Sequence, residues 1–320
     1  MSEHPPAAGK ASLVEIDESC SGQRIDNFLF TKLKGVPKSH VYRILRSGEV
    51  RVNGGRIQPS RKLDTGDKVR IPPLRLPERE EAPLPGNLLR ARLEHRILFE
   101  DDSFLVVNKP AGMAVHGGSG LAYGVIEAMR TIRPELRFIE LVHRLDRDTS
   151  GCLLLAKKRS ALRYLHELFR SEHDVEKFYL ALLSGVWARK QQLVDAPLKK
   201  NTLKSGERIV RIASDGKPAQ THFRRMRKYS GATLVEAQLL TGRTHQIRVH
   251  AQSIGHPLAG DERYGEEKLN AVFRAQGLKR LFLHAAKLSF KHPATGQPFS
   301  IEAPLETDLQ HYLNTLATLE

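Results

Sequence analysis

The chain has few of the residues and runs that build disulfide-rich, zinc-binding or membrane-embedded proteins. Its 320 residues include two cysteines, Cys20 and Cys152, which are too few for a disulfide framework or a cysteine-rich zinc site. No apolar run approaches the roughly 20 residues that a membrane-spanning helix needs. The opening MSEHPPAAGK also lacks the apolar core of a secretory signal peptide. We therefore predict a reducing, cytoplasmic location.

Motifs for nucleotide cofactors and catalytic metals are also missing from the sequence. It has no P-loop, no Gly-x-Gly-x-x-Gly after an expected strand and no His-Glu-x-x-His. The glycine-rich run at 117–120 lacks a following lysine, so we interpret it as a flexible loop. Three histidines, His143, His245 and His250, are scattered in a way that fits no ligand set, and we expect structural hydrogen bonding from them. We expect no cofactor and no metal, which disfavours a phosphate-transfer enzyme.

Acidic residues are outnumbered by basic ones. The chain has 51 Lys and Arg against 36 Asp and Glu, a formal charge of +15 and an isoelectric point near 9.9. A charge of this sign and size indicates a polyanionic partner, most commonly nucleic acid. The alternative is that the charge only keeps the protein soluble. A hydrophobic content of 40% is enough for a packed core, and the length favours two domains.

Positive charge is concentrated in residues 22–72, where twelve Lys and Arg face four Asp and Glu. Apolar residues at 25–33 and at 41–45 follow two helical stripes. Asn53-Gly54, which follows a short apolar alternation, is a strong hairpin signal, and residues 68–71 are typical of a strand. The charge density favours contact with an RNA backbone over an ordinary solvated surface. The candidate RNA-binding residues are Lys38, Arg43, Arg46 and Arg51.

The chain changes character on either side of this basic unit. Residues 1–21 are expected to be a disordered N-terminus, because the first dozen are small, polar and rich in proline. Five prolines between positions 72 and 85 favour an extended spacer. We therefore predict a small basic domain with its proline-rich linker over 22–85, and a second domain over 86–320.

The second domain is rich in expected strands. Residues 97–99 and 104–107 are typical of a hairpin, and 179–183, 233–237 and 281–283 are typical of further strands. Helical patterns cover 161–169 and 244–254. Many strands with few intervening helices favour an α+β fold, in which helices pack on a mixed, mostly antiparallel sheet.

Residues 141–157, LVHRLDRDTSGCLLLAK, hold a charged loop between two short apolar runs. Such runs are typical of buried strands, and loops on a rigid scaffold often carry chemistry. An EF-hand calcium loop is disfavoured, because its twelfth position is Lys157 instead of a bidentate Glu. Two interpretations stay open: an ordinary surface turn in which the aspartates pair with the arginines, and a catalytic loop.

The segment HRLDRDTSG at 143–151 resembles the signature of the RluA/RluC/RluD family of pseudouridine synthases. The signature specifies about eight of these nine positions, so a match is specific. VVNKPAGMAVHGG at 106–118, EKFYLAL at 176–182 and GRTHQIRVH at 242–250 are similar to the same family in the same order. The basic unit, which opens with GQRIDNFL, resembles an S4-type RNA-binding domain. The resemblance extends over most of residues 20–310.

The resemblance implies a pseudouridine synthase fold and catalytic residues. Asp146 is the expected catalytic carboxylate, and Arg248 is the cation expected to keep it ionised, with Arg243 as the alternative. A carboxylate in a pocket drifts towards its neutral form unless a cation holds it charged. Tyr179 is expected to offer the flipped base a flat surface and a hydroxyl for proton transfer. Arg144 is expected to enter the RNA where the uridine leaves.

We therefore expect a cofactor-independent enzyme that isomerises specific uridines of 23S ribosomal RNA, free or in a large-subunit precursor, to pseudouridine. The S4-type domain would deliver the RNA, and the protein is expected to be a monomer. The alternative is a non-catalytic RNA-binding or ribosome-assembly protein, which has no need for Asp146, Tyr179 and Arg248 together. Two points stay open: whether Asp146 attacks the sugar, attacks the base or removes a sugar proton, and which uridines are modified.

Overall fold

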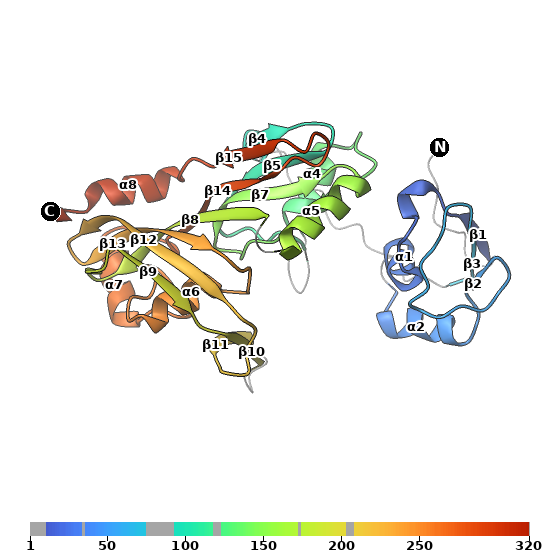
Figure 1. Ribbon diagram of the computed structural model, residues 1–320, viewed down its shortest axis with the longest axis horizontal. Coiled ribbons are helices and arrows are strands. Elements are labelled where there is room, and N and C mark those ends of the chain that lie inside the picture. The colour runs from blue at the N-terminus through green and yellow to red at the C-terminus, as the bar shows by residue number, and fades with distance from the viewer. Residues whose placement is uncertain are drawn as a thin grey trace. The chain divides into compact units, whose positions relative to one another are not determined.

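The computed structural model describes residues 11–33, 36–74, 93–117, 123–171, 174–202 and 208–319. Its two compact units are Met1–Pro83 and Leu84–Glu320 (Figure 1). The predictions for residues 1–10, for the linker over 75–92 and for glycines 118 and 120 lie outside the described residues. The domain boundary at residue 85 therefore stays a prediction.

The N-terminal unit packs two helices on a small antiparallel sheet of order β1-β3-β2. Its elements are β1 (Ser12–Glu15), α1 (Ile25–Lys32), α2 (Lys38–Arg46), β2 (Arg51–Val52) and β3 (Lys68–Ile71). The two predicted helical stripes form its core, in which Ile25, Leu29 and Ile44 are fully buried. The polar faces of both helices are left to solvent, as the sequence pattern predicts.

One prediction for this unit is wrong over the described residues. Residues 11–21 are not disordered, because Ser12–Glu15 form β1 and pair with β3. The neighbouring Ile16 is 2% exposed and joins the core. A single buried isoleucine and a free sheet edge are enough to order this segment, although its composition is polar.

The Asn-Gly turn forms, but its strand has another partner. Asn53 and Gly54 both adopt positive φ, 51° and 79°, and Val52 forms an isolated bridge with Gly55. β2 then pairs with the distant β3, where Val52 faces Val69. The chain after the turn does not alternate and contains proline, so it cannot extend a ladder.

The C-terminal unit is built on an eleven-stranded sheet. Its strands are β4 (Ile97–Glu100), β5 (Phe104–Lys109), β6 (Glu140–Leu141), β7 (Ser150–Ala156), β8 (Val175–Ser184), β9 (Gln191–Asp195), β12 (Gln220–Tyr229), β13 (Ala232–Leu239), β14 (Leu283–Lys291), β15 (Pro298–Glu302) and β16 (Thr318–Leu319). The main path runs β16-β12-β13-β8-β14-β7-β5-β4, with β15 on β14, β6 on β7 and β9 on β12. Among the described strands only β7 and β14 pair in parallel, so the predicted α+β class with a mostly antiparallel sheet is confirmed.

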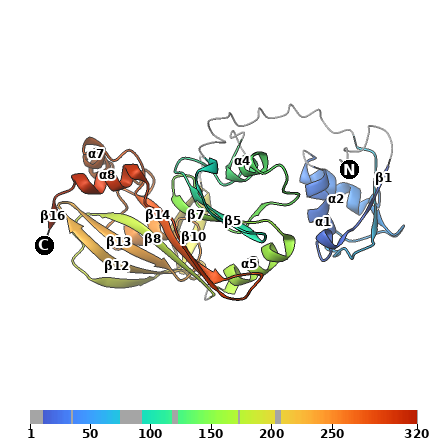
Figure 2. The same ribbon diagram turned by 90° about the horizontal axis from the view of Figure 1, so that it is seen from above.

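Helices cover both faces of this sheet. They are α4 (Val125–Ile132), α5 (Arg159–Ser171), α6 (Gln246–Ser253), α7 (Glu267–Ala275) and α8 (Thr307–Thr315). Alternate residues of β5 and β7 pack on α4 from one side and on α5 from the other, and Figure 2 shows these helices on opposite sides of the two strands. In the other half, α6 packs on one face and α7 and α8 on the other.

Two further strands form a hairpin beside α6. β10 (Leu198–Thr202) and β11 (Arg208–Ile212) pair with each other outside the main sheet. Leu198 and Val210 from the hairpin pack with Val249 of α6 and with Tyr264. This small core attaches the hairpin to the helix that carries the candidate arginine.

Within the described part of the chain, every helix is too short or too polar to span a bilayer.

Candidate active site

The charged loop, residues 142–149, connects β6 to β7 and is fixed at several points. Leu145 is buried in the core beside α4. Nε2 of His143 accepts a hydrogen bond from the backbone N–H of Leu154 at 3.1 Å, and its ring stacks on Phe169. The backbone N–H of Thr149 closes a turn onto the carbonyl oxygen of Asp146 at 3.2 Å. The loop is therefore an extension of the core rather than an ordinary surface turn.

Lys109, at the end of β5, also holds the charged loop in place. Its fully buried ammonium donates to the carbonyl oxygens of Pro110 at 2.9 Å, Met113 at 2.8 Å and Arg147 at 2.9 Å. Burial lowers the pKa of Lys109 to about 7. Three carbonyl acceptors nevertheless match the three N–H groups of the protonated amine. This lysine joins the start of the 110–117 loop to the residue next to Asp146.

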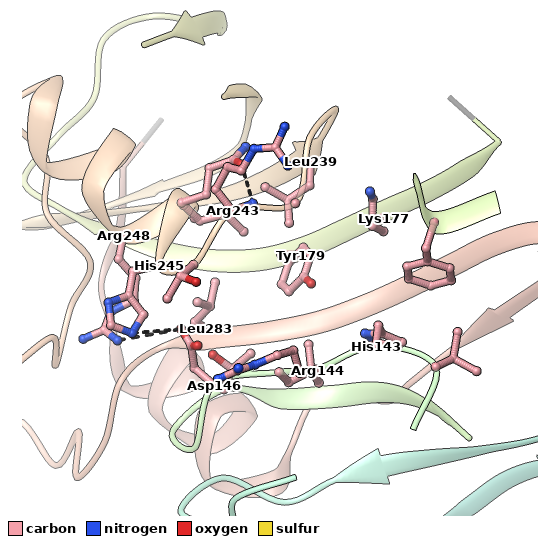
Figure 3. Close-up of a pocket in the computed structure, with 18 of the residues that line it drawn as sticks. His143, Arg144, Asp146, Lys177, Tyr179, Leu239, Arg243, His245, Arg248 and Leu283 are labelled. Atoms are coloured by element: carbon pink, nitrogen blue, oxygen red, sulfur yellow. Dashed lines mark hydrogen bonds and ion pairs between the residues drawn. The ribbon is translucent and has the colours of Figure 1, made fainter. Parts of the chain in front are cut away.

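The structure brings Asp146 and Arg248 together (Figure 3). Oδ2 of Asp146 lies 3.9 Å from Nη1 of Arg248 and 3.6 Å from Nε2 of His245. The Asp146 side chain is 24% exposed, so it can reach a ligand while its neighbours shield it from bulk water. The arrangement supplies one partly buried carboxylate with a cation and a ring nitrogen beside the same oxygen.

Arg248 is itself held in place by Asp261. Its Nε and Nη2 each donate to one carboxylate oxygen of Asp261 at 2.7 Å, and its guanidinium lies 4.9 Å from the centre of the Tyr264 ring. Burial by itself would raise the pKa of Asp261, but the hydrogen bonds and charge of Arg248 bring that pKa below its usual range. Arg248 is buried, with 8% of its surface exposed, although arginines on helices are usually exposed.

The start of α6 decides where His245 and Arg248 point. The helix begins at Gln246 rather than at the predicted residue 244, because His245 adopts a left-handed conformation with φ 54°. The Gln246 side chain accepts from the hydroxyl of Thr241 at 2.8 Å and from the backbone N–H of Arg243 at 3.0 Å. This anchor turns the His245 ring out of the helix and towards Asp146, as Figure 3 shows.

Tyr179 lies on β8, whose neighbours are β13 and β14. Its ring lines the same cavity as Asp146 and packs against the core residues that include Leu145. Burial, with a smaller contribution from the Asp146 charge, raises the pKa of the Tyr179 hydroxyl. Tyr179 therefore keeps its proton at neutral pH and offers a flat, apolar surface with a hydroxyl donor.

Two adjoining cavities meet at Asp146. One of about 390 Å³ contains Tyr179, Lys177 and His143 in its wall, and a larger one of about 1090 Å³ extends past Arg147, Arg263, Lys279 and Arg280. Their shared wall consists of Arg144, Leu145, Asp146, His245 and Arg248. The smaller cavity is in the size range of ligand pockets, and the larger one is lined with cations suited to a phosphate backbone.

The remaining candidates are Arg144 and Arg243 in the C-terminal unit and four basic residues in the N-terminal unit. Arg144 is exposed on the shared wall, and Asp148 pairs with Arg147 instead, at 3.3 Å. Arg243 lines the smaller cavity, and its Nε donates to the carbonyl oxygen of Pro218 at 3.0 Å. The basic candidates of the N-terminal unit are all exposed, on α2 and at β2: Lys38, Arg43, Arg46 and Arg51.

Among the described residues no cluster of His, Cys, Asp or Glu could hold a metal ion. His143 accepts from the backbone, and His250 is buried between Thr221 and the carbonyl oxygen of Ala196. Both therefore have the structural role that the sequence predicts. His245 differs from them, because its ring faces the candidate carboxylate.

Three residues of this site were not identified from the sequence. Asp261 and Tyr264 lie in a loop beyond α6 that bears no recognised motif, and only the fold brings them under Arg248. Lys109 lies within the VVNKPAGMAVHGG segment, but the sequence does not show that its ammonium group is buried. A lysine that ends a strand with a continuous apolar run, Phe104 to Val107, is the signal that could have identified it.

Comparisons with known proteins identify the family of both units. Residues 103–253 match the family model "RNA pseudouridylate synthase", and residues 23–69 match the S4 domain model. The chain is 58% identical over 307 residues to ribosomal large subunit pseudouridine synthase C of Escherichia coli (strain K12), covering 95% of this chain and 96% of the relative. It is 57% identical over 305 residues to the protein of the same name from Pasteurella multocida (strain Pm70), covering 95% and 93%.

A solved structure shares the fold at lower identity. Human RNA Pseudouridylate Synthase Domain Containing 4 superposes with a TM-score of 0.61 at 28% identity, over 73% of this chain and 98% of that one. The S4 domain and the catalytic fold predicted from the sequence are thereby confirmed.

Proposed function

The chain belongs to the RNA pseudouridylate synthase family, and we propose that it converts specific uridines of 23S ribosomal RNA to pseudouridine through the Asp146 carboxylate, without a cofactor. It is an RNA pseudouridine synthase, an isomerase. The segments GVPKSHVYRILRSGEVRVN, AVHGGSG and GERIVRI point within the family to ribosomal large subunit pseudouridine synthase C. Relatives of that name, 57–58% identical, confirm this prediction.

The substrate and setting follow from the same relatives. Their name specifies the large ribosomal subunit, so we propose its RNA, or a precursor of the subunit, as the partner of this chain. We propose further that the protein acts as a monomer in the cytoplasm, where ribosomal RNA of the bacterial relatives is made. The excess of 51 basic over 36 acidic residues supports an RNA partner.

The reaction needs no external electron or group donor. The bond between N1 of uracil and C1′ of ribose breaks, the base turns, and C5 bonds to C1′. C5 loses its proton and N1, which carries none in uridine, gains one, so atoms and electrons balance within one nucleotide. The uridine must first leave the RNA stack, and the cavity beside Asp146 has room to receive it.

Asp146 serves this chemistry only as a carboxylate. Whether it attacks carbon or removes a proton, it needs the ionised oxygen. The Arg248 guanidinium lies 3.9 Å away and places a positive charge beside that oxygen. Because Asp261 binds Arg248 through two hydrogen bonds, the guanidinium stays beside Asp146 without forming a tight pair that would occupy its oxygens.

We propose that Tyr179 and Arg144 hold the extruded uridine and the RNA around it. We assign to the Tyr179 ring the stacking of the extruded uracil, because the ring lines the cavity and the raised pKa of its hydroxyl keeps it neutral. We propose that the Arg144 side chain fills the space that the departing uridine leaves in the RNA. It is exposed at the junction of the two cavities, where it can reach the RNA. A planar guanidinium can stack on a base and bind phosphate at once.

The observation that carries this proposal is the meeting of Asp146, Arg248 and Tyr179 in one cavity. The test uses an unmodified large-subunit RNA transcript with tritium at C5 of uridine, since pseudouridine formation releases that label. The wild-type protein should release tritium, and Asp146→Asn should release none while binding the same RNA with similar affinity. RNA binding without tritium release by the wild type would instead support the non-catalytic alternative.

A further inference from the structure

His245 contacts the reactive carboxylate but has no role in the proposal so far. Its Nε2 lies 3.6 Å from Oδ2 of Asp146, and Nη1 of Arg248 lies 3.9 Å from the same oxygen. Both of these contacts are with Oδ2 of the carboxylate. Oδ2 is therefore the oxygen that faces both partners, and Oδ1 is the oxygen left to face the substrate.

The protonation of the His245 ring is determined by its other neighbour. Nδ1 lies 2.7 Å from the Tyr264 hydroxyl, and that oxygen accepts the backbone N–H of Val210 at 3.0 Å. A tyrosine hydroxyl has one proton to donate, and here Nδ1 is the acceptor within reach. If Tyr264 donates to Nδ1, then the proton of the neutral ring is on Nε2 and points at Asp146. A carboxylate accepts only, so both ends of the ring require the same tautomer.

Burial favours this neutral form, while the charges around the ring oppose one another: Asp146 and Asp261 raise the pKa of His245, and the arginines lower it. Asp146, Asp261, Arg248 and Arg263 face it together with the Tyr264 hydroxyl. Burial is the largest influence and lowers the pKa of His245 below its usual value. The ring is therefore a neutral hydrogen-bond donor at neutral pH, while the guanidinium of Arg248 supplies positive charge beside Asp146.

The backbone at position 245 is shaped for this contact. His245 is one of two residues other than glycine with positive φ in the described chain, and the second, Asn53, lies in a tight turn. A non-glycine residue in this conformation is uncommon and is often found where a side chain must be aimed. At His245 the conformation directs the ring away from α6 and into the wall of the cavity.

We propose that His245 is a positioning residue for the isomerisation, which donates Nε2–H to Oδ2 of Asp146 and turns Oδ1 towards the uridine. Tyr264 acts through His245 by fixing its tautomer, and the middle of β11 fixes Tyr264 through the backbone of Val210. The present distance is slightly longer than a hydrogen bond, and contacts of this kind commonly tighten in the substrate complex. This inference rests on the proposed function of Asp146.

His245→Gly tests the role of the ring with the backbone preserved, because glycine adopts positive φ without strain. In the tritium-release assay kcat should fall about 10- to 100-fold, the range for a lost hydrogen bond to a charged group. KM should stay close to the wild-type value, because the RNA-binding surfaces are intact. Added imidazole should restore part of kcat in His245→Gly, and it should restore none in Asp146→Asn. His245→Asn, which also tolerates positive φ, should retain more activity than His245→Gly.

Tyr264→Phe tests the tautomer separately. The phenyl ring still lies against Arg248, but the hydroxyl that donates to Nδ1 is lost. Nitrogen-15 chemical shifts of the His245 ring in the full chain should show Nε2–H in the wild type and a loss of that preference in Tyr264→Phe. This measurement does not depend on catalysis.

Several results would overturn the inference alone. They are a wild-type kcat in His245→Gly, a loss that appears in KM instead of kcat, a loss that neither imidazole nor asparagine reduces, and a wild-type ring with its proton on Nδ1. A wild-type protein that releases no tritium would overturn the proposed function and this inference with it, so the two failures are distinguishable.

Discussion

Arg248 is shared between two carboxylates, and this sharing defines the electrostatics of the site. Asp261 receives two hydrogen bonds of 2.7 Å from it, while Asp146 is 3.9 Å away. A buried arginine needs a partner to offset its desolvation, and Asp261 meets that need. Asp146 is left with the influence of the charge and with enough freedom to react.

Removal of the guanidinium should show how strongly Asp261 depends on it. In Arg248→Met, the buried Asp261 carboxylate is left without a cation, so the free energy of unfolding should fall by about 3–5 kcal/mol. Urea denaturation measures this difference. Arg243→Met is the matched control, since that side chain is only partly buried, and a similar loss there would contradict the assignment.

The same pair predicts a pH dependence of stability. Asp261 has a folded pKa below its usual value, so its stabilising contribution is present above the usual aspartate pKa and is lost as pH falls through the folded pKa. Wild-type protein should therefore lose stability in acid more steeply than Arg248→Met. Parallel curves for the two proteins would show that Arg248 does not hold this carboxylate charged.

Residue types and motifs could predict Asp146, Tyr179 and Arg248, because each lies in a segment with a recognisable pattern. Asp261 and Tyr264 could not be predicted, since their role comes from the return of the chain beneath α6. The proposed role of His245 depends on its positive φ, which the sequence Thr-His-Gln around it does not predict.

At the scale of elements, the contact between β7 and β14 positions the charged loop, residues 142–149. These strands pair in parallel, with Ser150 opposite His284 and Gly151 opposite Ala285. Gly151 has φ 110°, and a Cβ added there would lie 2.2 Å from the carbonyl oxygen of Ala285. The glycine in the HRLDRDTSG segment therefore allows β7 to start close enough to β14 for the loop to reach the cavity.

Gly151→Ala should separate the two strands at this point. The strained φ and the backbone clash together should lower the free energy of unfolding by about 2–3 kcal/mol or more, and the displaced loop should lower kcat. Gly242→Ala is the control, because a Cβ there meets no atom within 4 Å. Equal stability of the two variants, measured by thermal unfolding, would contradict the close-packing argument.

Periodicity predicted the existence of most elements but not their ends. The apolar run 281–283 was predicted to be a strand, yet β14 begins at Leu283. Phe282 instead exchanges backbone hydrogen bonds with Ala259 and Leu182 outside the regular ladder. An apolar pattern indicates burial, and it cannot distinguish a strand from an irregular buried segment.

At the scale of the whole molecule, the chain combines a basic S4 unit with a catalytic unit that has its own basic cavity. Each unit has a separate core. Composition predicted a polyanionic partner, since it reports charge without reference to fold, and the resemblance of both units to known RNA-acting domains made that partner RNA. The particular uridines depend on the shape of the RNA, which no property of this chain's sequence encodes directly.

Deletion of residues 1–85 should weaken RNA binding and flatten its salt dependence. Each lost phosphate contact reduces the slope of log K against log salt by about 0.7–0.9. In the full chain, Arg43→Gln with Arg46→Gln should reduce the slope by about 1–2 for the same reason. Lys268→Gln, an exposed lysine on α7, is the control with an unchanged slope. An unchanged slope in the deletion variant would exclude the S4 unit from RNA binding.

The most direct measurement is a map of pseudouridine in large-subunit RNA from a strain that lacks this protein, supplied with wild-type or Asp146→Asn protein at equal abundance. Specific uridines should be unmodified in the deletion strain, pseudouridine should return with the wild type, and it should stay absent with Asp146→Asn. Return of the modification with Asp146→Asn, or a deletion strain with a normal map, would contradict the central claim.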